Sequence, residues 1–215
     1  MAAVSGDMTI TGSYTIENTV FTIDGTLTIT STGTLTIRNA ELRFVSDGSN
    51  PHSMIVNGGK LILDGGTITT YLDQVSSYPF LTMTVQNGAS VKASNDSVLR
   101  FPGSLTISGA TTKVNLSGTN ITHLDLSMVD KYYSPILTDA DYGPAITITD
   151  ATVELYDSRI DSLPELGGAA NNLTLAGNAE FTAVNTYIDV DFIHVTYPSH
   201  NKLLMQNNAR AYLYG

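Results

Sequence analysis

The feature that most constrains the fold is a short strand pattern that the chain repeats at close intervals. Residues 25–44 read GTLTITSTGTLTIRNAELRF, and nearly the same strand occurs three times in this stretch. Alternation of apolar and polar residues with a period of two indicates strands that have one buried face. No helical pattern separates the copies. The repeat is carried by pairs of apolar residues two positions apart, namely Leu27/Ile29, Leu35/Ile37 and Leu42/Phe44.

The same alternation extends through most of the chain and makes the sequence all-β. Further apolar pairs are Met8/Ile10, Tyr14/Ile16, Phe21/Ile23, Met54/Val56, Leu61/Leu63, Met83/Val85, Leu105/Ile107, Val114/Leu116, Ile146/Ile148, Val153/Leu155, Leu173/Leu175 and Leu203/Met205. Many runs end in a turn signal, because Gly, Asn and Asp tolerate the backbone angles of tight turns. These turn pairs are Asp24-Gly25, Asn57-Gly58, Asp64-Gly65, Asn87-Gly88, Ser117-Gly118 and Ala176-Gly177.

Two architectures use many short strands, an antiparallel sandwich or barrel and a parallel β-helix. A sandwich is expected to show turn signals about every 8–12 residues. Here the strands begin closer together, as at Leu27, Leu35 and Leu42. This spacing favours a single-stranded parallel β-helix, or β-solenoid, in which three short strands and three corners make one coil. With roughly 22 residues per coil, we expect about nine or ten coils stacked into a rod roughly 45 Å long.

Four segments break the strand rhythm of what we predict to be one solenoid domain spanning residues 1–215. We expect these segments to be loops inserted at coil corners, near 71–80, 125–143, 161–172 and 196–201. Loops carry specificity in solenoids because the walls are regular. The four segments are therefore either solvated insertions or surfaces for lateral contact.

Composition excludes several classes of partner. The net charge of −10, with ten Lys and Arg, leaves no basic stripe for nucleic acid and disfavours an anionic membrane surface. No segment approaches the roughly 18 apolar residues of a membrane span, and the absence of Cys excludes disulfides and thiolate metal sites. The start, MAAVSGDMTI, lacks the pattern of a signal peptide. The chain is therefore either cytoplasmic or a mature or excised segment, and we favour the second.

Two runs, FTIDGTLTITSTGTLTIRNAELRFVSDG and GPAITITDATVELYDSRI, resemble segments of a known group of proteins. They look like the right-handed parallel β-helices of archaeal cell-surface proteins of the pectate-lyase-like group, such as surface-layer and sheath proteins of methanogens. The resemblance covers residues 8–125 and 144–215. It rests on the residue types and repeat of the short strands and not on a diagnostic motif. It implies an extracellular structural protein that associates with itself.

Two features of the sequence point to self-assembly. Both ends lack an obvious cap, so the chain is a fragment of a longer protein, has a cap of another kind, or polymerises head to tail. Tyrosines, which supply large amphipathic contact area, concentrate in the loops and near the C-terminus. The candidate interface residues are Tyr71, Tyr78, Tyr132, Tyr133, Tyr142, Tyr212, Leu213 and Tyr214.

Clustered carboxylates give the leading alternative, a carbohydrate-binding or carbohydrate-cleaving β-helix. Asp189 and Asp191 share one face of a strand, with His194 nearby, and glycosidases use paired carboxylates as general acid and base. Such a site also needs carboxylates from neighbouring coils and a cation for an acidic sugar. The sequence offers these in an unknown register, as Asp157, Asp161, Arg159 and Lys202. Because an outward solvated strand explains the same residues, we predict that the protein is not an enzyme.

The sequence gives no strong metal or cofactor signal. Asp139 and Asp141 precede a Gly and faintly resemble a calcium loop, but Asp150 stands where an EF-hand needs Glu. The prediction is therefore no cofactor, with calcium as the alternative. The four His residues have no ligand spacing, and no Gly-rich phosphate cradle is present.

Threonine and asparagine leave two further hypotheses for the outer walls. Thr occupies the positions opposite the apolar pairs, as in TLTIT at 26–30, which suits an outward strand position and also resembles the flat Thr arrays of ice-binding surfaces. The sequons Asn-x-Ser/Thr are candidate glycan sites on an exported protein. They lie at Asn95, Asn115, Asn120 and Asn172. Together with the resemblance to archaeal cell-surface proteins, these features predict an extracellular homopolymer, with glycans as a further partner.

Overall fold

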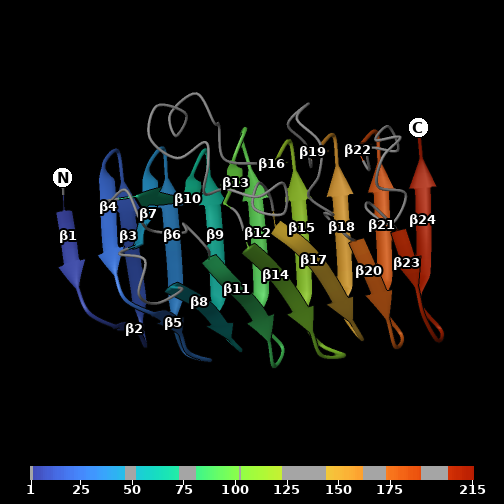
Figure 1. The fold of residues 1–215 in the computed structure, drawn as a ribbon, viewed down its shortest axis with the longest axis horizontal. Helices are drawn as coiled ribbons and strands as arrows, with labels where there is room; N and C mark the ends of the chain where they lie inside the picture. Colours follow the sequence, from blue (N-terminus) through green and yellow to red (C-terminus); the bar gives the residue numbers. More distant parts are fainter. Residues whose placement is uncertain are drawn as a thin grey trace, which may run out of the picture.

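The computed structural model is a parallel β-helix built from three eight-stranded sheets (Figure 1). It describes residues 2–46, 52–72, 81–101, 103–122, 144–161, 173–189 and 203–215. All strand pairs are parallel, and no helix occurs among these residues. The all-β solenoid prediction is therefore confirmed.

Each coil contributes one strand to each sheet, so coil 1 consists of β1 to β3, coil 2 of β4 to β6, and coil 8 of β22 to β24. Sheet A contains β1 (Ala2–Ser5), β4 (Val20–Asp24), β7 (Glu41–Ser46), β10 (Thr67–Leu72), β13 (Val98–Arg100), β16 (Asn120–Thr122), β19 (Arg159–Asp161) and β22 (Tyr187–Asp189). Sheet B contains β2 (Met8–Ile10), β5 (Leu27–Ile29), β8 (His52–Asn57), β11 (Leu81–Gln86), β14 (Gly103–Ser108), β17 (Pro144–Thr149), β20 (Leu173–Ala176) and β23 (Leu203–Met205). Sheet C contains β3 (Ser13–Glu17), β6 (Thr34–Arg38), β9 (Lys60–Asp64), β12 (Ser90–Ser94), β15 (Lys113–Ser117), β18 (Thr152–Tyr156), β21 (Glu180–Val184) and β24 (Arg210–Tyr214).

The described chain makes eight coils, fewer than the nine or ten expected from a constant coil length. Coil length varies: Thr26 bonds to Asp7 one coil away across 19 residues, whereas Thr119 bonds to Ser158 one coil away across 39. The additional residues fall between a strand of sheet A and the following strand of sheet B, as between β16 and β17. The four predicted loops fall at this corner of the sequence. Tyr71 and Leu72 belong to β10 and Asp161 to β19, and the rest of the four segments lies outside the described residues.

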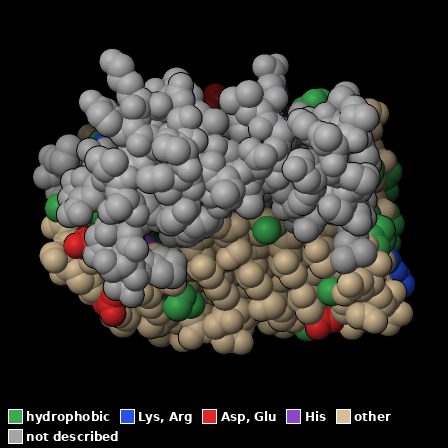
Figure 2. All heavy atoms as spheres, in the orientation of Figure 1, with side chains coloured by type: hydrophobic (Ala, Val, Ile, Leu, Met, Phe, Trp, Pro, Cys, Tyr) green, Lys and Arg blue, Asp and Glu red, His purple; other side chains and the backbone are tan. Residues whose placement is uncertain are grey.

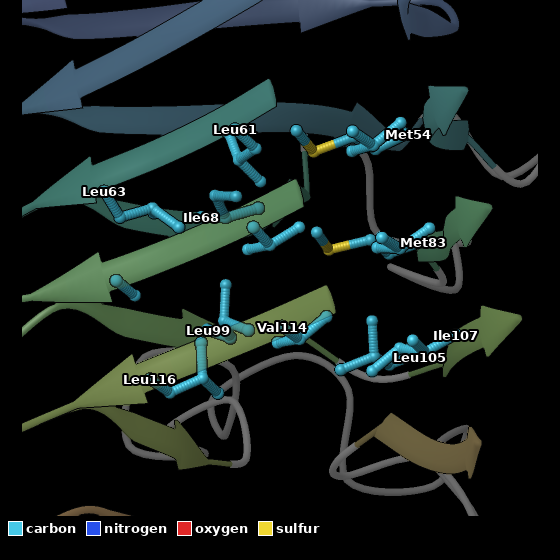
Figure 3. Close-up of a cluster of buried hydrophobic side chains, with 14 of the residues drawn as sticks. Met54, Leu61, Leu63, Ile68, Met83, Leu99, Leu105, Ile107, Val114 and Leu116 are labelled. Carbon is cyan, nitrogen blue, oxygen red and sulfur yellow. The ribbon is translucent and has the colours of Figure 1, made fainter. Parts of the chain in front are cut away.

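Most of the predicted apolar pairs form the interior of the coil, whereas Tyr14 in the first coil and Met205 in the last are exposed. Burial alternates along the strands, and the register stacks each interior residue on its counterpart in the next coil. Figure 3 shows Met54 of β8 above Met83 of β11, facing leucines of sheet C. The core runs through all three sheets and encloses an apolar cavity of about 20 Å³ between coils 4 and 7, whose lining includes Met83, Val114 and Phe181.

The corner that leads from sheet C to sheet A uses residues that tolerate a left-handed backbone. Asn18, Asn39, Asp157 and Asn185 occupy the first corner position with φ between 44° and 50°, and their N–H groups donate to carbonyl oxygens of the next coil. An L-residue with a larger side chain adopts this conformation at a cost, whereas Asn and Asp do so readily. The turn residues of the sequence therefore fix where each coil bends.

The last corner position before sheet A holds a small residue, which is buried in most coils and packs against the preceding coil. The Ser158 hydroxyl donates to the carbonyl oxygen of Tyr156 at 2.8 Å and accepts from the Thr119 N–H at 3.1 Å. Ser97 similarly donates to the carbonyl oxygen of Ser94 and accepts from the Gly66 N–H. These hydroxyls satisfy backbone groups that would otherwise be buried without partners.

Candidate functional site

The outer walls of the solenoid carry the candidate functional residues, and each wall has a different chemistry. Strand alternation directs every second residue outward, and the register then arranges the outward residues into files that run along the rod. The spacing between neighbours in a file is about 4.8 Å. Sequence reasoning identified the outward residues but did not establish which of them are neighbours.

On sheet A, the register brings two aspartates to neighbouring coils. Asp161 of β19 pairs with Asp189 of β22, and Arg159 pairs with Tyr187. The Arg159 guanidinium lies 4.9 Å from the centre of the Tyr187 ring, a cation–π contact. Asp191, His194 and Lys202, the other members of the predicted carbohydrate site, lie outside the described residues. Asp157, which was predicted for the same site, lies in the corner between β18 of sheet C and β19 of sheet A.

Three buried polar atoms in coils 3 to 5 have no hydrogen-bond partner among the described residues: His52 Nε2, Thr70 Oγ1 and Arg100 Nε. His52 is only 7% exposed, and its Nε2 lies 3.6 Å from Oδ1 of Asp24. That distance is outside hydrogen-bond range but allows an ion pair when the imidazole is protonated. Sequence reasoning found no role for His52, because its burial depends on the stacking of coils.

On sheet C, a charged network links four coils at the N-terminal half. Arg38 Nε lies 3.1 Å from Oδ2 of Asp64, and Arg38 Nη1 lies 3.4 Å from Oε1 of Glu17. The Asn95 amide donates to Oδ1 of Asp64 at 2.6 Å. These hydrogen bonds, first from Asn95 and then from Arg38, hold the pKa of Asp64 below its ordinary value. The network is exposed, so its ion pairs contribute little to the free energy of unfolding. Its contacts favour the observed register between coils on this wall.

The same wall becomes aromatic toward the C-terminal end. In one file Tyr156, Val184 and Tyr214 are register partners, and in the next file Thr182 pairs with Tyr212. Tyr212 is 40% exposed and Tyr214 58%. Both belong to the predicted assembly set. The two tyrosines point to the outside of the wall, and Tyr214 extends the apolar file of Tyr156 and Val184 by one coil.

The edge of the last described coil exposes further apolar side chains. Leu213 is 59% exposed although it occupies an interior file, where its register partner Ala183 is buried. Met205 of β23 is 46% exposed. At the opposite end, Tyr14 is 38% exposed and packs edge-on against Phe21. Among the other predicted interface residues, Tyr71 lies in β10, and Tyr78, Tyr132, Tyr133 and Tyr142 lie outside the described residues.

Sheet B presents an uncharged wall with one continuous file rich in threonine. The file runs Thr9, Thr28, Ile55, Thr84, Thr106, Thr147, Thr174 and Leu204 in register order. The sequence showed Thr at alternate positions but did not show that these residues align across coils. Figure 2 shows this wall over β11, β14 and β17 as a mostly tan surface, with charged side chains at its margins.

Two of the predicted glycan sites are engaged in the folded wall. The amide nitrogen of Asn95 donates to Asp64, and that of Asn115 donates to Oε2 of Glu154 at 2.9 Å. Asn120 is partly exposed in β16, and Asn172 lies outside the described residues. A glycan on Asn95 or Asn115 would therefore replace a hydrogen bond between coils.

Within the described residues, no group of three or more His, Cys, Asp or Glu side chains is arranged to hold a metal ion. The calcium candidates Asp139 and Asp141 lie outside that part of the chain. The described residues also include no helix long and apolar enough to cross a membrane.

Comparison with known proteins gave no match: no family model fits the chain, and no curated protein or solved structure was found to be similar to it.

Proposed function

We propose that this chain is a structural component of an extracellular layer, sheath or filament of the cell envelope, and that it assembles with copies of itself. The observation that carries this proposal is the unbroken stacking of eight coils in three parallel sheets. A rod of this kind has hydrogen-bond ladders along its whole length, which suits a mechanical role. The resemblance to archaeal β-helical surface proteins supports the extracellular location.

The coil edges supply the contact for assembly in this proposal. The edge formed by β22, β23 and β24 has backbone groups that another coil of the same cross-section would pair. Leu213 and Met205 are exposed at this edge, and a second copy stacked on it would bury them. A contact between unlike ends repeats without closing, and it gives a filament.

Negative-stain electron microscopy and sedimentation of the purified protein over a concentration series test the proposal. We expect filaments, tubes or sheets in the parent protein and their loss in Leu213→Lys, which places a charge in an interior file of the edge coil. The matched control is Thr182→Lys, on the outer face of the preceding coil. A parent protein that remains a monomer at every concentration would contradict the proposal, as would normal assembly of Leu213→Lys.

The pairing of Asp161 with Asp189 favours a second candidate function, binding or cleavage of a saccharide on sheet A. Two aspartates in register on neighbouring coils, together with the Arg159–Tyr187 pair, would provide acid–base groups, a cation and an aromatic face for an acidic sugar. The test is binding and cleavage of acidic polysaccharides by the parent protein and by the Asp161→Asn/Asp189→Asn variant. Activity that is lost in the variant would support this candidate, and an inactive, non-binding parent would remove it.

A further inference from the structure

We propose that the outer face of sheet B is a lateral interface, through which two copies of this chain pack face to face. This inference rests on the proposed function and adds a second contact to it, along the side of the rod instead of at its ends. The wall in question consists of the outward residues of β2, β5, β8, β11, β14, β17, β20 and β23.

Charge distinguishes this wall from the other two. None of the eight described strands of sheet B contains Asp, Glu, Lys or Arg. Strands of sheet A contain residues such as Glu41, Arg43 and Arg100, and those of sheet C contain residues such as Lys60, Lys92 and Glu154. Copies with a net charge of −10 repel one another, and repulsion is weakest where an uncharged wall is presented. Depletion of charge is also the compositional mark of an interface centre.

The shape of the outward side chains suits close packing. Thr84, Thr106 and Thr147 are consecutive in the central file, and each is a small β-branched residue with few rotamers. Ordering such side chains at an interface costs little entropy compared with Lys, Glu or Gln. Ladders of identical small side chains on a flat face can interdigitate with the ladders of a facing sheet, as in a steric zipper.

The available area is sufficient for a specific pair. Eight strands about 4.8 Å apart span roughly 34 Å along the rod, and their three to six residues span about 10–20 Å, roughly 15 Å on average. Facing walls would therefore remove about 1,000 Å² of surface in total, which is about the area that a specific interface needs. Two identical faces make an isologous contact about a two-fold axis, so pairing closes at two rods.

The chemistry of the wall favours a second copy over other occupants. The described strands of sheet B contain no Phe, Tyr or Trp, so the wall has no aromatic platform on which a sugar ring could stack. Ile55 interrupts the file of hydroxyls, which weakens a match to an ice lattice but adds apolar area to a protein contact.

The test places either charge at the centre of the wall, in Thr106→Lys and Thr106→Glu. Both variants should weaken lateral pairing by about 100-fold or more, because each copy would bury an unpaired charge. If net charge alone governed association, the two variants would change it in opposite directions. The controls are Thr36→Lys and Thr36→Glu on the outer face of sheet C, which should pair like the parent. Sedimentation measures pairing, and circular dichroism verifies the fold of every variant.

Cross-linking locates the contact independently, since the chain has no Cys. Single-cysteine variants along the file, at Thr28, Thr84, Thr106, Thr147 and Thr174, should form disulfide-linked dimers under mild oxidation. For an isologous pair, the yield should peak next to the two-fold axis and fall away on both sides. Thr36→Cys is the control and should give none. Equal yields at Thr36 and along the file would overturn the inference.

Electron microscopy separates this inference from the proposed function. Loss of paired rods in the Thr106 variants, with single-rod filaments retained, supports both. Filaments whose width is the same in parent and Thr106 variants overturn the lateral interface alone. Pairs without filaments in the parent support the lateral interface and contradict axial assembly. A strictly monomeric parent overturns the inference. If that monomer also stops ice growth through this wall, the wall binds ice instead of a second copy.

Discussion

Sheets B and C enclose the same core with the same hydrogen-bond ladder, yet their outer faces differ completely. In coil 5, β14 and β15 both bury every second residue and pair with both neighbouring coils. Outside, sheet B carries a file of threonines, whereas sheet C carries the Arg38 ion network at one end and exposed tyrosines at the other. The coil determines the interior of a wall and leaves its exterior free. The outward residues of each wall are therefore free to match the solvent or the partner that the wall contacts.

The largest effect should come from the core that the two walls share. We expect Leu105→Ala in sheet B and Leu116→Ala in sheet C each to lower the free energy of unfolding by about 2–5 kcal/mol, because both side chains are buried in the same coil. Urea unfolding followed by circular dichroism measures both. If one of the two variants lost several times more free energy of unfolding than the other, the two walls would not share one cooperative core.

The corner that leaves sheet C should be more sensitive than the corner that enters it. Asn39 has a φ of 44°, so Asn39→Ala should lower stability by about 1–2 kcal/mol, whereas Asn39→Gly should change it little. Ser31, in the corner between sheets B and C of the same coil, is exposed and has no positive φ. Thermal unfolding of Asn39→Ala and Ser31→Ala makes the comparison. Equal shifts would indicate that the left-handed corner is not what bends the coil.

The cavity gives a third comparison, in which one added methyl group should have opposite effects. Val114 of sheet C lines the cavity, so Val114→Ile should raise stability by roughly 0.5–2 kcal/mol. Val56 of sheet B is fully buried and does not line it, so Val56→Ile should overpack the core and lower stability. Urea midpoints of both variants test the signs. Destabilisation by both would mean that the cavity cannot accept a methyl group.

The smallest effect should be a pH dependence confined to sheet C. The pKa of Asp64 is lower in the folded chain than in the unfolded one. Its stabilising contribution is therefore complete above the unfolded pKa and is lost as the pH falls through the folded pKa. Melting temperatures of the parent and Asp64→Asn should differ slightly at neutral pH and converge in acid. Thr147→Val on sheet B, which changes no titratable group, should shift the melting temperature equally at all pH values.

The solenoid could be predicted from sequence because its signals are local. The pairs Leu27/Ile29 and Leu35/Ile37 gave the buried face of each strand, and the six predicted turn pairs all have their glycine at a positive φ between strands. The number of coils could not be predicted. Coil length depends on how many residues each corner between sheets A and B accepts, and no local pattern records that number.

The candidate sites were harder to predict because they depend on register. Thr106 and Thr147 are 41 positions apart in the sequence, yet they are neighbours in one file. The pairing of Asp161 with Asp189 and the contact between Arg38 and Asp64 likewise depend on insertions between coils. Exposure of Tyr212 and Tyr214 followed more simply, because both alternate with an interior residue in one strand.

The direction of the ladders also determines how such a rod would respond to force. Hydrogen bonds between coils run along the rod, so axial tension loads the bonds of all three sheets between two coils at the same moment. Pulling one terminus sideways loads the hydrogen bonds between coils one after another. The rod should therefore resist stretching far better than peeling. Unravelling would begin at a terminal coil, and stacked neighbours would shield that coil from it.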